Sequence, residues 1–283
     1  MNNLQKYFST SLLATAALFA AVSPASAAVS LGAAAQFAVL AGSNATCTDG
    51  IIVGDVGVAP GSAVPYTNTG CTIAGAVPPA TDAAAVAARA DMLATYASFQ
   101  YLSCIPLTGT LAAVTLAPGV YCLDAVAKTG TLTLDGPANG VWIFRVNGAL
   151  TGTNFSVVMT GGAQPCNVYW APSGAATLTT SNFKGTILAG NESIGSITLT
   201  GGSFAGSALA AVAVTITGTS VVGCSALSGG GNGGHGGKDH AKCNQGVGNG
   251  PEGCDPGNSN HKHGSNDENG GTPGNPGRKG GNR

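Results

Sequence analysis

The chain has 283 residues, of which only 8% are charged, and its formal net charge is −1. Between Ala28 and Cys224 it carries four basic and seven acidic side chains. This composition lacks the basic patch that a nucleic-acid-binding protein needs. It also lacks the polybasic or strongly amphipathic segment of a peripheral membrane protein. We therefore expect no nucleic-acid partner, no membrane partner, and a surface made polar by Thr, Ser, Asn and Gly.

The first 27 residues have the pattern of a secretory signal peptide. Lys6 gives a short positive start, an apolar run extends from Leu12 to Val22, and Ala25-Ser26-Ala27 is an A-x-A cleavage site. The apolar run is too short to span a bilayer. We predict a signal peptide over residues 1–27, a mature chain that begins near Ala28, and a secreted, extracellular protein that is also compatible with association with the cell surface.

The eight cysteines fit an exported protein, because an even number of cysteines in a secreted chain usually indicates disulfides. The sequence permits about 105 connectivities. Pairing by proximity in the sequence predicts the disulfides Cys47–Cys71, Cys104–Cys122, Cys166–Cys224 and Cys243–Cys254. No cysteine lies in a C-x-x-C motif, so neither a zinc ribbon nor a thioredoxin-type redox site is indicated. We expect no metal and no cofactor.

The first part of the mature chain, residues 28–80, contains short β-like runs broken by Gly, Asn and Pro. Residues 81–103 form the one predicted helix, in which Thr81 or Asp82 caps the start and alanines fill the interior. One stripe recurs at helical spacing and is the expected packing face: Val86, Ala90, Leu93 and Ala97, flanked by Met92, Tyr96 and Phe99.

The second part of the chain, from Thr108 to about Cys224, is rich in β-like sequence and has no helical period. Residues 227–283 form a tail that is dominated by Gly, Asn, Pro and His and has no aromatic residue. Such a segment buries too little apolar surface to offset the entropy of ordering the chain. We predict a folded domain over residues 28–226 and a disordered tail over residues 227–283.

Four copies of a short pattern lie in the β-rich part: an aliphatic residue and Thr, then small residues, then an apolar residue. The copies start at Ala149, Thr177, Thr198 and Thr215, which are 28, 21 and 17 residues apart. Repetition at this period predicts a β-solenoid, in which each coil covers the apolar edge of its neighbour. Six or seven coils at about 4.8 Å each match a helix of about 33 Å, which predicts one helix along the stack.

A series of segments between Val29 and Cys224 carries a family resemblance. They are Leu31-Gly32, Phe37-Ala38-Val39-Leu40-Ala41-Gly42, Gly54-Asp55-Val56-Gly57-Val58-Ala59-Pro60-Gly61, Leu116-Ala117-Pro118-Gly119-Val120-Tyr121-Cys122, Val141-Trp142-Ile143-Phe144, Gly161-Gly162-Ala163-Gln164-Pro165-Cys166-Asn167-Val168-Tyr169-Trp170 and Gly206-Ser207-Ala208-Leu209-Ala210. In this order they resemble the microbial ice-binding (antifreeze) protein family. The resemblance implies a mainly β fold, a right-handed β-solenoid of triangular section with about six or seven coils. It also implies one flanking α-helix and first coil segments that close against later ones.

The resemblance further implies adsorption to an ice crystal surface through a flat face rich in Thr, Ser and Ala, which inhibits ice growth and recrystallisation. Members of the family often carry a T-(A/G)-x-(T/N) motif on that face. Thr151-Gly152-Thr153-Asn154 fits the motif, whereas the segments that start at Thr179, Thr200 and Thr217 each depart from it at one position.

Alternation along a strand sends Thr198 and Thr200 to one face and Leu199 to the other. The residues predicted to stack in the core are Leu150, Leu178, Leu199 and Ile216, and those predicted to turn inward at the next corner are Phe155, Phe183, Phe204 and Val221. The outward threonines form a grid of about 4.7–4.8 Å across coils and about 6.6–6.8 Å along a strand, which is close to spacings available on ice surfaces. The predicted ice-contacting residues are Thr151, Thr153, Thr177, Thr179, Ser181, Thr198, Thr200, Ser203, Thr215, Thr217 and Thr219.

Other interpretations stay open at this point. Threonine is favoured on any exposed β surface, and a second flat face with Thr186 and Ser207 competes as the ice-binding site. The same solenoid also fits a structural module of a cell-surface or matrix adhesin. No enzyme is expected, because all four histidines lie in the tail and the sequence shows no carboxylate cluster, although Asp124 and Asp135 could lie close in space. We expect a monomer.

Overall fold

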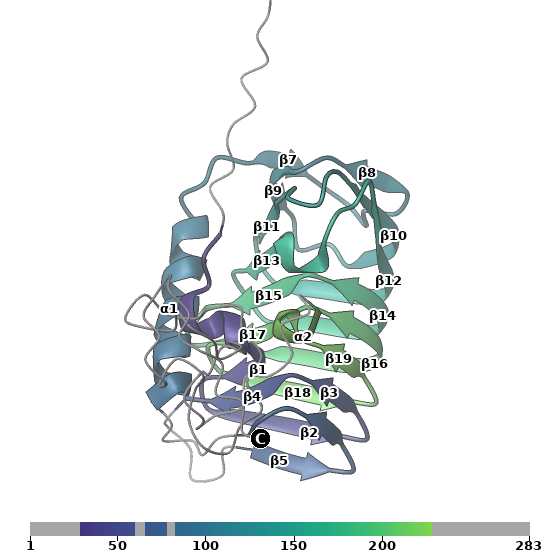
Figure 1. Cartoon of the computed structure of the whole chain (residues 1–283). Helices are drawn as coiled ribbons and strands as arrows, with labels where there is room; N and C mark the ends of the chain where they lie inside the picture. Colours follow the sequence, from purple (N-terminus) through teal and green to yellow (C-terminus); the bar gives the residue numbers. More distant parts are fainter. Residues whose placement is uncertain (1–28, 60–65, 78–82, 228–283) are drawn as a thin grey trace, which may run out of the picture.

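The computed structural model describes residues 29–59, 66–77 and 83–227. The predicted signal peptide, the helix cap at Thr81 or Asp82, the Cys243–Cys254 pair and almost all of the predicted tail lie outside the described residues. Parallel strands and one long helix make up the described part (Figure 1), so the mainly β architecture is confirmed. The handedness of the winding and the number of coils stay predictions.

The first wall of the solenoid is a sheet of eight strands. In spatial order they are β4 (Asp55–Val58), β1 (Phe37–Ala41), β17 (Ala208–Ala210), β15 (Thr186–Ala189), β13 (Val168–Pro172), β11 (Trp142–Val146), β9 (Gly119–Leu123) and β7 (Ile105–Leu107). Every neighbouring pair is parallel. Parallel neighbours need a crossover between them, and here the rest of each coil provides it.

A second sheet forms the other two walls. Its main path is β5 (Tyr66–Thr69), β2 (Asn44–Thr48), β18 (Ala213–Thr217), β16 (Ile197–Ala205), β14 (Ala176–Lys184), β12 (Leu150–Thr160), β10 (Lys128–Asp135) and β8 (Val114–Leu116). The first half of β16 pairs with β18, whereas its second half pairs with β19 (Ser220–Val222). β19 continues to β3 (Ile51–Val53) and β6 (Thr72–Ala74). The first halves of the long strands therefore belong to the second wall and their second halves to the third wall.

The spatial order of the strands differs from their order in the chain. β1, β2 and β3 lie between the last coil (β17, β18 and β19) and the coil of β4, β5 and β6. In Figure 1 the purple and blue strands accordingly lie directly against the green ones. The implied closure of the first coil segments against later ones is thus confirmed.

The helix α1 (Ala83–Phe99) and the short helix η1 (Gly32–Gln36) cover the outer face of the first wall (Figure 1). The described part of α1 has 17 residues, about 26 Å at about 1.5 Å per residue. The helix ends at Phe99, so the predicted end at residue 103 is too late, whereas the predicted start at residue 81 lies outside the described residues. Its buried residues are Ala85, Ala88, Met92, Thr95 and Phe99. The predicted stripe is wrong: Val86, Ala90 and Ala97 are exposed and Leu93 is half-buried. Alanine occupies eight of the 17 helix positions, so the bulky Met92 and Phe99 decide which face packs.

The core inside the solenoid contains the predicted inward residues. Leu150, Leu178, Leu199, Ile216, Phe155, Phe183, Phe204 and Val221 are all at most 3% exposed. An aromatic series crosses this core, in which ring centroids are 4.0 Å apart for Phe144 and Trp170, 4.9 Å for Trp170 and Phe183, and 5.6 Å for Phe183 and Phe204. Close-packed rings hold neighbouring coils at a fixed separation, so the outer surfaces of the walls are rigidly supported.

The first copy of the repeat is placed two residues away from its predicted register. Thr151 lies opposite Thr177, and Leu178 lies opposite Gly152 rather than Leu150. The corner has the same length in both copies, because Ser156 lies opposite Asn182 just as Thr153 lies opposite Thr179. Phe155 therefore lies opposite the buried Ser181 and not opposite Phe183. Aligning the copies on their phenylalanines therefore displaces their threonines.

Three predicted disulfides are confirmed: Cys47–Cys71, Cys104–Cys122 and Cys166–Cys224. They tie β2 to the segment before β6, the segment before β7 to β9, and η2 (Pro165–Asn167) to α2 (Cys224–Leu227). Within the residues that the structure describes, no helix is long and apolar enough to cross a bilayer.

Candidate functional site

The second wall carries twelve threonines in two straight ranks. Six adjacent strands, β5, β2, β18, β16, β14 and β12, each supply a Thr-x-Thr segment in the same register. The first rank is Thr67, Thr46, Thr215, Thr198, Thr177 and Thr151, and the second is Thr69, Thr48, Thr217, Thr200, Thr179 and Thr153. We call these twelve residues the threonine array.

The residue between the two threonines of each strand points inward, because side chains alternate across a strand. These central residues are Asn68, Cys47, Ile216, Leu199, Leu178 and Gly152. Ile216 and Leu199 are each 1% exposed, whereas every threonine of the array is half-buried or exposed. The central residue is buried in every array strand except β5, where Asn68 is exposed, so burial fixes which way the threonines of the other five strands face.

The array is a regular grid of short, uncharged side chains. Neighbouring strands lie about 4.8 Å apart, and residues i and i+2 of a strand lie about 6.7 Å apart. Neither rank contains a charged residue. Among the hydrogen bonds between described residues, none engages the Oγ1 atom of any of the twelve. The hydroxyls are therefore available to water or to an external ligand.

The second rank ends at a corner that has the same backbone conformation in every coil. The next residue has a positive φ in each strand of the array: Gly70, Asp49, Gly218, Gly201, Thr180 and Asn154, with φ between 47° and 78°. Gly, Asn and Asp adopt this conformation readily, whereas a β-branched residue does so only under strain. At Thr180 the side chain is also anchored, because its Oγ1 donates to Asn154 Oδ1 at 2.6 Å. The corner limits the array to two ranks.

Three predicted contact residues lie outside the array, and two of them are buried. Ser181 is 3% exposed and Thr219 is 2% exposed. Ser181 Oγ accepts from the Phe155 N–H at 3.2 Å and donates to Thr179 O at 3.0 Å, and Thr219 Oγ1 donates to Gly201 O at 3.1 Å. These hydroxyls link adjacent coils at the corner by hydrogen bonds. Ser203 is exposed but lies past the corner, on the third wall.

The competing face is not accessible at its predicted residues. Thr186 and Ser207 are both 0% exposed. Thr186 Oγ1 lies 3.9 Å from Cys224 Sγ in α2, and η2 packs nearby against β15. The alternative ice-binding site with Thr186 and Ser207 is therefore wrong. The residues around the Cys166–Cys224 disulfide cover Thr186, and the outer side of this wall packs against α1 and η1.

The outward side chains of the third wall are mixed. Ile51 is 49% exposed and Val158 is 40% exposed. The same surface carries Lys184, Asn182 and the exposed Asp135, which accepts from Thr160 Oγ1 at 2.7 Å. These side chains differ in length, charge and polarity, so the third wall lacks the uniformity of the array.

A profile of the protein family described as Ice-binding-like matches residues 25–222. The chain belongs to this family. Among curated relatives, the Ice-binding protein K3-B1 of Typhula ishikariensis is 32% identical over 214 residues, which cover 65% of this chain and 86% of the relative. The Ice-binding protein of Nostoc sp. (strain HG1) is 38% identical over 182 residues, which cover 61% of this chain and 64% of the relative.

Solved structures of ice-binding proteins have the same fold. The ice-binding protein of the Antarctic ascomycete Antarctomyces psychrotrophicus matches with a TM-score of 0.58 at 30% identity, covering 69% of this chain and 98% of that chain. An ice-binding protein from an Antarctic bacterium of the Flavobacteriaceae matches with a TM-score of 0.60 at 33% identity, covering 69% of this chain and 47% of that chain. The family resemblance in the sequence and the solenoid beside one helix are thus confirmed.

Four threonines of the array in this ice-binding-like chain were missing from the sequence prediction. Thr46, Thr48, Thr67 and Thr69 come from β2 and β5, far from the four repeats in the chain. A search for Thr-x-Thr would have found them, as Thr46-Cys47-Thr48 and Thr67-Asn68-Thr69. The aliphatic residue that defines the repeat is Cys47 in one case and Asn68 in the other, so the repeat pattern excludes both.

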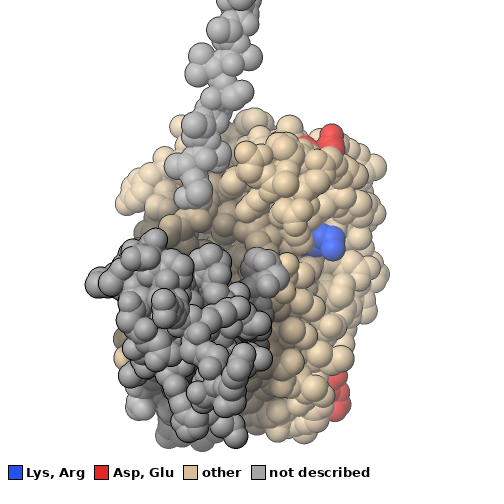
Figure 2. Space-filling view, viewed as in Figure 1, with Lys and Arg blue, Asp and Glu red and all other residues tan. Residues whose placement is uncertain are grey.

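One charged residue borders the array, the exposed Asp49 at the corner after Thr48, whereas the charged pair of this ice-binding-like domain lies elsewhere. Few charged side chains mark the face seen in Figure 2. Asp124 binds the buried Lys128, whose Nζ donates to Asp124 Oδ1 at 2.8 Å and to Gly109 O at 2.8 Å. The hydrogen bond from Lys128 and that from the Gly109 N–H lower the pKa of the Asp124 carboxyl. In the described ranges, no group of three or more His, Cys, Asp and Glu residues is arranged to hold a metal ion.

Proposed function

We propose that this protein binds ice through the threonine array and thereby inhibits ice growth and recrystallisation. The observation that carries the proposal is the straight register of twelve outward threonines over six strands. Membership of the ice-binding-like family supports it, as do relatives that are named ice-binding proteins. The predicted contact set is therefore revised: Ser181, Thr219 and Ser203 leave it, and Thr46, Thr48, Thr67 and Thr69 join it.

Ice offers a repeating surface of water molecules, so a repeating protein surface is the complementary ligand. Each hydroxyl can hydrogen-bond a water or order a bridging one, and each methyl gains dispersion contact. A net gain of about 0.5 kcal/mol for one hydroxyl cannot hold a protein on a surface. Twelve such gains act together only when the side chains are held in register, which strand pairing supports throughout and burial of the central residue supports in five of the six strands.

The absence of long charged side chains from the two ranks suits this function. A lysine or glutamate on a docking surface loses rotamer freedom and hydration when that surface meets a solid. Threonine has one short side-chain torsion, which is already restricted by β-branching. Its ordering cost on docking is therefore small, and the twelve small gains are not cancelled.

The same proposal includes the winding of the solenoid, the oligomeric state, the lack of enzymatic activity and the location of the protein. We propose a right-handed solenoid of about six or seven coils, a monomer, a protein without enzymatic activity, and secretion outside the cell. The signal-like first 27 residues and the three disulfides support export, because disulfides persist mainly in oxidising compartments. The near absence of charge in the repeats supports a role other than catalysis.

The decisive experiment follows ice grains in a polycrystalline film held just below the melting point. We expect grains to stay small in the presence of the mature protein and to coarsen with a heat-denatured sample. Thr200→Tyr, in the middle of the second rank, should abolish the effect, because the projecting ring separates the flat surface from the ice. Thr131→Tyr, at an exposed threonine of the third wall, should act like the wild type. Equal coarsening with native and denatured protein, without faceted crystals, would refute the proposal.

A further inference from the structure

The end strand β5 supplies Thr67 and Thr69 to the array but has little apolar anchorage. Among the strands that the structure describes, it is the last of its sheet and pairs with β2 alone. Thr67, Asn68 and Thr69 are all exposed, and Tyr66 alone packs against the core. In the strands β18, β16 and β14 the central residue is a buried Ile or Leu, whereas in β5 it is Asn68. Hydrophobic burial therefore cannot hold this strand as it holds the others.

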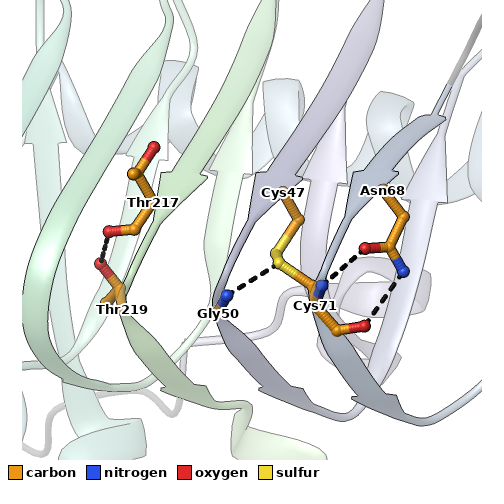
Figure 3. The surroundings of a disulfide bond; sticks show 6 residues. All are labelled: Cys47, Gly50, Asn68, Cys71, Thr217 and Thr219. Carbon is orange, nitrogen blue, oxygen red and sulfur yellow. Dashed lines mark hydrogen bonds between the residues drawn. A yellow bond between two sulfur atoms is a disulfide. The ribbon is translucent and has the colours of Figure 1, made fainter.

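A clamp made of Asn68, Gly50 and the Cys47–Cys71 disulfide takes the place of that apolar anchorage (Figure 3). Asn68 Nδ2 donates to Cys71 O at 3.1 Å, and the Cys71 N–H donates to Asn68 Oδ1 at 2.8 Å. Cys71 is bonded to Cys47, which lies in β2 directly opposite Asn68. The Gly50 N–H donates to Cys71 Sγ at 3.0 Å. The clamp thus joins the segment just after β5 to β2 and to the corner that follows β2.

The clamp lies directly beneath the array. Cys47 is the inward residue between Thr46 and Thr48, and Asn68 is the residue between Thr67 and Thr69. Cys104–Cys122 joins the segment before β7 to β9 on the first wall, and Cys166–Cys224 joins η2 to α2. Of the three disulfides between described residues, only Cys47–Cys71 includes a residue of a strand that carries the array.

We propose that Asn68 and the Cys47–Cys71 disulfide are positioning residues of the ice-binding surface, which hold Thr67 and Thr69 in register with the other ten threonines. This inference rests on the proposed function. An edge strand with one neighbour and no buried central residue belongs to the low-stability part of a fold. Without the clamp, β5 opens locally, and the array is shortened from six strands to five.

The experiment compares two matched disulfide deletions, Cys47→Ala/Cys71→Ala and Cys104→Ala/Cys122→Ala. The loops that they close are similar in length, with sequence separations of 24 and 18, so both should lower Tm. The first variant should need about 3- to 10-fold more protein to arrest recrystallisation, which corresponds to the loss of two threonine contacts. The second should match the wild type at temperatures where both variants are folded. Asn68→Ala, which keeps all three disulfides, should show a loss in the same direction as the first variant.

A double-mutant cycle separates positioning from general stabilisation. In a Thr67→Ala/Thr69→Ala background, the contacts that the clamp positions are already absent, so deleting the clamp should cause no further loss of activity. Amide hydrogen exchange of Thr67, Asn68 and Thr69 should also accelerate in the clamp variants, while exchange in β14 and β16 stays slow. An equal loss of activity in both backgrounds, or unchanged exchange in β5, would overturn the inference. If the wild type fails to bind ice, the proposed function falls, and the exchange rates still decide whether the clamp orders β5.

Discussion

Thr48 lies directly opposite Thr217 in neighbouring parallel strands, although almost the whole folded domain separates the two residues in the chain. The pair joins two parts of the sequence into one surface. On one side of the pair is β5, and on the other are β16, β14 and β12, which together with β18 carry the four repeats recognisable in the sequence. The array therefore continues without interruption across the place where the first coil closes against the last.

This continuity predicts that Thr48→Tyr is as damaging as Thr200→Tyr. Both residues belong to the second rank, and a ring at either position lifts the flat surface away from ice. We expect a loss of recrystallisation inhibition of at least about tenfold in each case, equivalent to about 1.4 kcal/mol or more, with little change in Tm because both side chains face outward. An inactive Thr200→Tyr together with a fully active Thr48→Tyr would restrict the site to the repeats.

The buried corner hydroxyl of Ser181 predicts a separation of stability from activity. Ser181→Ala leaves the Phe155 N–H without its partner, which should cost about 1–3 kcal/mol and lower Tm by several degrees. Activity in the cold should be unchanged. Thr179→Ala is the matched variant in the same strand, where we expect the opposite: reduced activity with a smaller loss of Tm. A folded but inactive Ser181→Ala protein would return Ser181 to the ice-contacting surface.

The left-handed corner predicts a stabilising substitution at Thr180. Its φ is 47°, a conformation that is strained for a β-branched residue and natural for glycine. Glycine occupies the equivalent corner of the neighbouring strand as Gly201. Thr180→Gly should raise the free energy of unfolding by about 1 kcal/mol, after allowance for the lost bond to Asn154, and leave ice activity intact. A calorimetric Tm below that of the wild type would show that the bond to Asn154 outweighs the strain.

The Asp124–Lys128 pair predicts a dependence of stability on acidity. The pKa of Asp124 is lower in the folded protein than in the unfolded chain, because Lys128 and the Gly109 N–H bind its charged form. The pair therefore stabilises the fold above the ordinary pKa of about 3.9, and this contribution is lost as the pH falls through the lower folded value. Asp124→Asn should have a lower Tm at pH 7, because Lys128 loses its counter-charge, and a smaller fall of Tm between pH 5 and pH 2 than the wild type. Parallel Tm curves for the two proteins would contradict the assignment.

Much of the array was predictable from local sequence. In Thr198-Leu199-Thr200, alternation with a period of two is sufficient to send both threonines outward and the leucine inward. The same reasoning held for the strands at Thr177 and Thr215. Pairing each cysteine with the next one in the chain also sufficed for the three disulfides. Cys47–Cys71 and Cys104–Cys122 join residues about one coil apart, whereas Cys166–Cys224 spans 58 residues and joins different coils.

The corner and the closure were not predictable in this way. At Thr180 the left-handed residue interrupts the alternation, so Ser181 points inward, although counting by twos from Thr179 places it outside. Thr219 is misplaced for the same reason after Gly218. Thr46 and Thr67 join the array only through pairing with strands that are distant in the chain. No periodicity within a strand encodes which strand will lie beside it.

β1, β2 and β3 lie between the last coil and the coil of β4, β5 and β6. This arrangement determines when the array can form during synthesis and folding. During synthesis β2 emerges early, but its neighbour β18 is among the last strands to leave the ribosome. The full-width array therefore exists only after the end of the domain has been made and has found its beginning. Pairing between such distant segments is slow to form, and until it forms, one side of β2 presents an open strand edge that can pair with other chains. The uninterrupted surface on which the proposed activity depends thus forms only at the final stage of folding.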